Sequence, residues 1–134
     1  MNTAAPSIIL TSNDVQRLET MLDSPQYRDA PGAAALHGEL ERAHVVPPQE
    51  LPRDVISMNS TAECVDEASG RTHAITLVYP READAAQGRI SVLAPVGAAL
   101  LGMKVGQSID WPAPSGTLRL RVTAVSFQPE AAGG

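Results

Sequence analysis

The chain has 134 residues, a net charge of −5 at pH 7 and 43% hydrophobic residues. This length allows one domain, or one domain with an appendage, and the hydrophobic fraction is enough for one modest core. The sequence contains no basic run and only four aromatic side chains, which argues against phosphate binding along a duplex and against base stacking on a single strand. We therefore expect a protein partner and no sequence-specific binding of nucleic acid.

Compartment and membrane contact are also constrained by the sequence. Cys64 is the only cysteine, so no intramolecular disulfide can form, as is typical of a reducing compartment. The N-terminus lacks a basic segment followed by a long apolar stretch, and no apolar run is long enough to cross a bilayer. We expect a cytoplasmic monomer without membrane contact.

Residues 1–46 are predicted to form a short antiparallel helical hairpin. Thr11 can cap a first helix, with Asp14 at the third position of a near capping box, and a second helix is expected over residues 33–44. Residues 24–32 are turn-like and join the two helices. The apolar side chains that share one face of each helix, at spacings of three and four, are Val15, Leu18 and Leu22 in the first and Ala33, Leu36, Leu40 and Ala43 in the second.

After a proline-rich linker over residues 47–54, the pattern changes to strands. The predicted strands cover residues 55–65, 72–79, 90–92, 108–111 and 117–127, with one short helix that begins at Pro95 and ends at Gly102. Alternation in the last strand breaks at Val125 and Phe127, which predicts a bulge or a two-sided end. The predicted fold is α+β: a helical hairpin, then an antiparallel sheet over residues 55–134 wrapped on one short helix.

No pattern in the sequence predicts an enzyme, a metal site or a cofactor. Gly97 and Gly102 have the glycine spacing of a phosphate-binding loop, but Met103 stands where its lysine must be, so a short core helix is the better interpretation. The three histidines, His37, His44 and His73, lack partners at metal-ligand spacing. Cys64 has acidic neighbours, which favours a structural thiol over a reactive one.

One segment is distinctive, residues 90–110, which reads ISVLAPVGAALLGMKVGQSID. It resembles the C-terminal domain of the Gre transcript factors, in which a strand, a Ser-Pro-hydrophobic-Gly turn, a short Ala-Leu helix and a Gly-x-x-x-Gly-Asp exit recur. The segments VISMNS (55–60), TLVYP (76–80) and QPEAAG (128–133) are similar to the Rnk branch of this family, in which the helical hairpin is shortened.

The resemblance implies an FKBP-like antiparallel sheet domain and a protein that binds RNA polymerase near its secondary channel, in competition with Gre factors. The part most like Gre factors, and so the expected docking site, is Leu93, Ala94, Pro95, Val96 and Gly97, in which Pro95 and Val96 would form an exposed apolar knob. The hairpin tip would carry Asp23, Tyr27, Arg28 and Asp29.

Departures from the Gre pattern separate this chain from a cleavage factor. Gre factors carry an acidic pair at the tip of a long coiled coil, which helps to hold magnesium for transcript cleavage, and the turn between Asp23 and Asp29 has no such pair. Ala94 replaces the Gre-type serine before the proline, and Gln107 replaces the usual aspartate. We therefore expect a regulator without catalytic activity.

Two other functions follow from the resemblance. One is control of the level or activity of nucleoside diphosphate kinase through another protein partner. The other is prolyl isomerisation, an activity found on FKBP-like folds. That reaction uses an aromatic-lined pocket, and the four scattered aromatics Trp111, Tyr27, Tyr79 and Phe127 argue against it.

Overall fold

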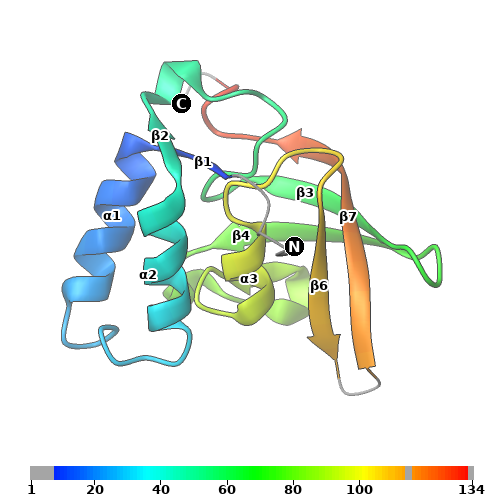
Figure 1. Ribbon diagram of the computed structural model, residues 1–134, viewed down its shortest axis with the longest axis horizontal. Coiled ribbons are helices and arrows are strands. Elements are labelled where there is room, and N and C mark those ends of the chain that lie inside the picture. The colour runs from blue at the N-terminus through cyan, green and yellow to red at the C-terminus, as the bar shows by residue number, and fades with distance from the viewer. Residues whose placement is uncertain (1–7, 114–115, 133–134) are drawn as a thin grey trace, which may run out of the picture.

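The computed structural model describes residues 8–113 and 116–132. A helical N-terminal region precedes a sheet, so the predicted α+β class is confirmed (Figure 1). The N-terminal region consists of β1 (Ile9–Thr11), α1 (Ser12–Asp23), α2 (Ala33–Arg42) and β2 (His44–Val46). The remainder consists of the 3-10 turns η1 (Pro48–Glu50), η2 (Pro80–Glu82) and η3 (Ala85–Gln87), the strands β3 (Thr61–Asp66), β4 (Thr72–Val78), β5 (Arg89–Ser91), β6 (Ser108–Ala113) and β7 (Gly116–Phe127), and helix α3 (Pro95–Leu100).

The main sheet is mixed, not purely antiparallel as the sequence predicted. Its strand order is β5-β4-β3-β7-β6, and every pair is antiparallel except β4 with β5, which run parallel from Thr76 opposite Arg89 to Val78 opposite Ser91. Parallel neighbours cannot be joined by a tight hairpin turn. The connection over residues 79–88, which contains η2 and η3, gives the chain the length to cross back before β5 begins.

The first strand of the sheet begins at Thr61, later than the predicted residue 55. The reason is a turn held by side chains: the Ser57 amide donates to the Ser60 hydroxyl at 2.9 Å, and Asn59 adopts a φ of 67°. Asparagine tolerates this left-handed conformation better than most residues. Val55 forms only an isolated bridge, with Lys104.

Hydrogen bonds hold the base of the hairpin in place. Thr11 caps α1 as predicted, because its hydroxyl oxygen accepts a hydrogen bond from the Asp14 amide at 3.0 Å. Helix α2 ends at Arg42 and not at His44, since His44–Val46 leave the helix to pair in parallel with β1. Both ends of the hairpin are therefore joined in one small two-stranded sheet.

The hairpin and the main sheet share one hydrophobic core. Leu18 and Leu36 of the two helices are fully buried and belong to the same cluster as Leu77 of β4 and Leu120 of β7. Figure 1 shows α1 and α2 side by side, with α3 between them and the sheet. The short helices are thus stabilised by packing on the sheet, since helices of this length are marginal alone.

The last strand has the predicted irregularity. Val125 pairs with Ala62 and Phe127 with Thr61, which leaves Ser126 as an extra residue, and a second register shift lies between Glu63 and Cys64. Along β7 the expected alternation holds for Arg119, Leu120, Arg121 and Val122, with the arginines exposed and the other two buried. The side chain of Leu118, predicted on the buried face, lies outside those described.

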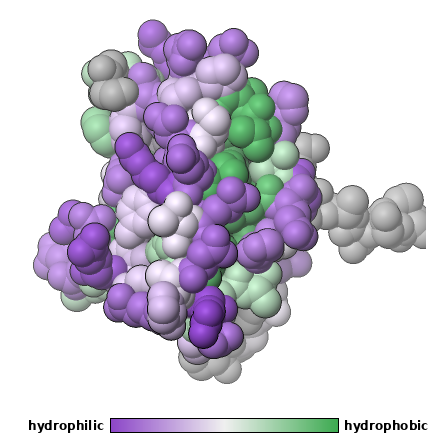
Figure 2. Space-filling view, turned by 90° about the vertical axis from the view of Figure 1, so that its left-hand side faces the viewer, coloured by the Kyte–Doolittle hydropathy of each residue, from purple (hydrophilic) through white to green (hydrophobic). Residues whose placement is uncertain are grey.

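The hairpin side of the molecule is mostly hydrophilic, with its hydrophobic side chains gathered in one strip (Figure 2). Within residues 8–113 and 116–132, no helix has the length and apolar character needed to span a membrane.

Candidate partner-binding surface

The loop before α3 places the residues predicted to dock a partner. The Ser91 hydroxyl accepts from the Leu93 amide and the Ser91 carbonyl accepts from the Ala94 amide, both at 3.0 Å, which makes a tight turn. Pro95 begins α3, where its missing N–H leaves no helical bond unmade. Pro95 is exposed, whereas Leu93 and Ala94 are half-buried.

Val96 is not part of an exposed knob, contrary to the prediction. Its side chain is only 5% exposed, because α3 packs against β5, β6 and α2 and the second residue of the helix faces that core. Gly97 is buried as well, and a Cβ added there would lie 2.0 Å from the Ser91 carbonyl oxygen. The apolar surface at this loop therefore consists of Pro95 flanked by Leu93 and Ala94.

The hairpin turn holds the four residues predicted at its tip. Asp23, Arg28 and Asp29 are exposed, Tyr27 is half-buried, and Arg28 pairs with Asp29 at 3.8 Å. The turn is ordered by its own backbone, since the Tyr27 and Arg28 amides both donate to the Ser24 carbonyl. Across the described residues, no group of three His, Cys, Asp or Glu side chains could hold a metal ion.

The turn and the loop touch at Gly32. This residue precedes α2 with a φ of 89°, and a Cβ added to it would lie 2.0 Å from the Leu93 carbonyl oxygen. Only glycine permits both the left-handed backbone and such a close approach. The two segments that the sequence singled out separately are thus adjacent parts of one surface.

A cleft of about 580 Å³ lies beside the hairpin turn. It is formed by α1, the first residues of the turn and η2, three segments that no sequence pattern brings together. Its lining residues are Arg17, Thr20, Met21, Ser24, Gln26, Tyr27, Tyr79, Pro80, Arg81 and Glu82. Both tyrosines of the chain contribute to it.

Asp14 joins the hairpin to the sheet domain, a role that the sequence did not reveal. Its carboxylate does not complete a capping box at Thr11 but accepts a hydrogen bond from the Met58 amide at 3.0 Å, and the residue is only 4% exposed. Burial raises the pKa of Asp14 to about 6, the Met58 bond and Arg17 oppose this rise, and Glu130 adds to it.

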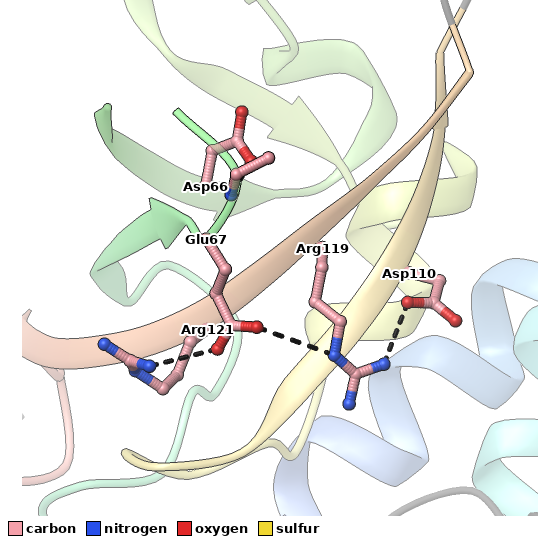
Figure 3. Close-up of polar contacts among 6 residues, drawn as sticks. Asp66, Glu67, Asp110, Arg119 and Arg121 are labelled. Atoms are coloured by element: carbon pink, nitrogen blue, oxygen red, sulfur yellow. Dashed lines mark hydrogen bonds and ion pairs between the residues drawn. The ribbon is translucent and has the colours of Figure 1, made fainter. Parts of the chain in front are cut away.

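The outer face of β7 carries a row of ion pairs (Figure 3). Arg119 contacts Asp110 at 2.9 Å and Glu67 at 3.8 Å, and Arg121 contacts Glu67 at 3.0 Å. Nearby, bonds from the Ser69 hydroxyl and the Ala68 amide lower the pKa of Asp66. These exposed pairs contribute little stability, but they leave the charges of this face largely matched among themselves.

Cys64, His37 and the stretch with phosphate-loop spacing are three features that could suggest catalysis. Burial raises the pKa of the Cys64 thiol to about 11, so the thiol stays protonated and poorly nucleophilic at neutral pH. His37 contacts Glu41 at 3.6 Å on the exposed side of α2. The stretch with phosphate-loop spacing is the core helix α3, in which Ala98 and Leu100 are buried.

Comparison with known proteins identifies the family. Residues 6–46 match the family described as "Rnk N-terminus", and residues 51–127 match "Transcription elongation factor, GreA/GreB, C-term". The chain belongs to the Rnk branch of the GreA/GreB family. Over 129 residues it is 43% identical to "Regulator of nucleoside diphosphate kinase" of Escherichia coli K12, which covers 96% of this chain and 95% of that protein.

More distant relatives and solved structures agree with this assignment. The chain is 41% identical over 86 residues to the transcription elongation factor GreA of Rhodospirillum rubrum, covering 64% of this chain and 55% of that one. A GreA/GreB structure from Nitrosomonas europaea aligns with a TM-score of 0.78 at 44% identity, covering 91% of this chain and 99% of that one. GreA factor homolog 1 of Thermus thermophilus aligns with a TM-score of 0.52 at 25% identity, covering 91% and 100%.

Proposed function

We propose that this chain is a non-catalytic cytoplasmic regulator that binds RNA polymerase near the secondary channel and competes there with Gre factors. The observation that carries the proposal is the joined surface of the loop and the hairpin turn, in a chain whose C-terminal part matches the GreA/GreB family. The exposed Pro95, between two half-buried apolar residues, is a rigid point at which a partner can dock.

The short hairpin supports a regulator that does not cleave transcripts. The turn that joins the end of α1 to the start of α2 lies against the sheet domain at Leu93. It therefore does not project far from the globular body. Asp23 and Asp29 are exposed and lie on either side of Pro25 in the sequence. The Asp29 carboxylate is already paired with Arg28.

The protein is therefore expected not to stimulate transcript cleavage when added to backtracked RNA polymerase. Asp23 and Asp29 lack the spacing of the Gre acidic pair, and a magnesium ion needs oxygen ligands that reach it together. Cleavage products are measured on a gel, with a Gre factor as the positive control. Cleavage above background that disappears in the double variant Asp23→Ala, Asp29→Ala would show that the turn does coordinate metal.

Replacement of the docking proline tests the surface itself. Pro95→Asp keeps a residue that helix starts tolerate and adds a charge at the apolar point, so affinity for RNA polymerase should fall about thirtyfold. Binding is measured by titration of fluorescent protein with the enzyme, and circular dichroism checks the fold. Wild-type affinity in a normally folded Pro95→Asp variant would place the docking surface elsewhere.

A second candidate function is supported by the name of the E. coli relative, which matches over nearly the whole chain: the protein would regulate nucleoside diphosphate kinase. Addition of the purified chain to that kinase tests this candidate, because a direct regulator changes the rate of phosphate transfer and a polymerase-binding protein leaves it unaltered.

A further inference from the structure

The helical hairpin contacts the docking loop just before α3. Gly32, the residue before α2, lies so close to Leu93 that an added Cβ would be 2.0 Å from the Leu93 carbonyl oxygen and 3.1 Å from its carbonyl carbon. Both sides of this contact are backbone, so neither segment can shift toward the other without displacing it. The hairpin turn therefore limits where the chain just before Pro95 can lie.

The base of the hairpin contacts the other end of α3. Gly102 follows this helix with a φ of 80°, and its carbonyl oxygen accepts a hydrogen bond from the Ile9 amide of β1 at 3.2 Å. A Cβ added to Gly102 would lie 2.7 Å from the Cβ of Ile8. Residues 93–102, the docking segment, are thus held at one end by the hairpin turn and at the other by the strand that begins the hairpin.

The docking segment has little structure of its own to keep it in place. The two turn-forming hydrogen bonds at its start, from the amides of Leu93 and Ala94, both end on Ser91. Helix α3 has six residues, and helices this short are not stable without packing. The packing is supplied by β5, β6 and α2, and Figure 1 shows α3 between the hairpin and the sheet. The position of Pro95, in the first turn of α3, therefore depends on the hairpin.

We propose that the hairpin of this chain positions the docking loop for its partner by holding both ends of the docking segment, with Gly32 as a positioning residue. This inference rests on the proposed function. It assigns a task to a hairpin whose turn lies against the sheet domain at Leu93 and does not project far from it. The turn changes the affinity for RNA polymerase through the placement of Pro95, without contacting the polymerase itself.

Gly32→Ala tests the contact at the turn. The added methyl displaces the Leu93 carbonyl, so affinity for RNA polymerase should fall about tenfold. Binding is measured by titration of the fluorescently labelled chain with the enzyme, at a temperature where circular dichroism shows that the variant is folded. Wild-type affinity in the folded variant would overturn the proposal.

Gly70→Ala is the matched control. Gly70 lies in the β3–β4 turn with a φ of 75°, so alanine is strained there as it is at Gly32, but no atom lies within 4 Å of an added Cβ. This variant should have a lower unfolding temperature and an affinity within about twofold of wild type. An equal loss of affinity in the two variants would assign the effect to general destabilisation and contradict the positioning role.

The combination of Gly32→Ala with Pro95→Asp distinguishes positioning from direct contact. If the turn acts only through the docking loop, the double variant should bind no more weakly than Pro95→Asp alone, because the contact that the turn supports is already lost. If the turn itself contacts the polymerase, the two losses should multiply to about three-hundredfold, and the proposal is wrong.

Native-state hydrogen exchange of the wild-type chain tests the proposal without a variant and without polymerase. The Leu93 and Ala94 amides should exchange at least as fast as the Leu36 amide, which bonds to the Gly32 carbonyl, because the docking loop loses its support when α2 opens. Loop amides that stay protected through openings that exchange Leu36 would refute the positioning role. A chain that does not bind polymerase refutes the proposed function, whereas exchange in the free chain still decides whether the hairpin holds the loop.

Discussion

Gly32→Ala is expected to destabilise the protein by about 3 kcal/mol. The new methyl would lie 2.0 Å from the Leu93 carbonyl oxygen, and alanine disfavours the φ of 89° found there. The added Cβ is fixed to the backbone of residue 32, and the Leu93 oxygen belongs to the backbone of the docking loop. Neither atom can turn aside alone, so the hairpin turn must move away from the docking loop. Urea unfolding measures the loss.

Gly38→Ala provides the matched control for this experiment. Gly38 lies within α2 and has no atom within 4 Å of an added Cβ, so the same substitution should stabilise the protein by about 0.5–1 kcal/mol through helix propensity. Opposite changes in the free energy of unfolding at two glycines only six positions apart would locate the effect at the contact between turn and loop. Equal effects of both substitutions would contradict the close contact between turn and loop.

Asp14→Asn is expected to change how stability depends on pH. The pKa of Asp14 is about 6 in the folded protein and about 4 in the unfolded chain, so the native state binds the proton more tightly. Stability from this group is fully present below pH 4 and is lost as pH rises through 6. A difference of two pKa units corresponds to about 3 kcal/mol.

The asparagine variant retains an oxygen that can accept from the Met58 amide but carries no charge. It should match the wild type at pH 4 and exceed it by up to about 3 kcal/mol at pH 7.5, measured by urea unfolding at both values. Asp14→Ala is the contrasting variant, because it leaves the Met58 amide buried and unpaired and should lose about 1–3 kcal/mol at pH 4. Parallel pH profiles for the wild type and Asp14→Asn would contradict the burial of an ionisable carboxylate.

The parts of the fold that sequence patterns predicted correctly are those governed by local physical chemistry. The Thr11 cap, the apolar stripes of the two helices, the start of α3 at Pro95 and the irregularity near Phe127 each follow from spacing or from the geometry of one residue type. The prediction of a purely antiparallel sheet was wrong at β5, which pairs in parallel with β4. The direction in which a long connection returns depends on tertiary packing and leaves no periodic signal in the sequence.

The proposed docking surface is harder to predict for the same reason. The pattern that indicates a loop before α3 also predicts Val96 on its exposed side, whereas Val96 is buried, since a helix of one or two turns has too few residues for its buried face to be recognised. The cleft needs α1, the hairpin turn and η2 in contact, and the burial of Asp14 depends on Met58, far away in sequence. An acidic residue beside an otherwise ordinary helix cap is the only local sign of the buried carboxylate.

We propose that the chain binds RNA polymerase in place of a Gre factor without cleaving the transcript, and one assay tests both parts. Backtracked polymerase is mixed with a fixed amount of GreA and increasing amounts of this protein, and the rate of transcript cleavage is recorded. Cleavage is expected to fall toward the rate seen without GreA, and excess GreA should restore it. A rate that stays constant, or rises with the added protein, would contradict the proposed function.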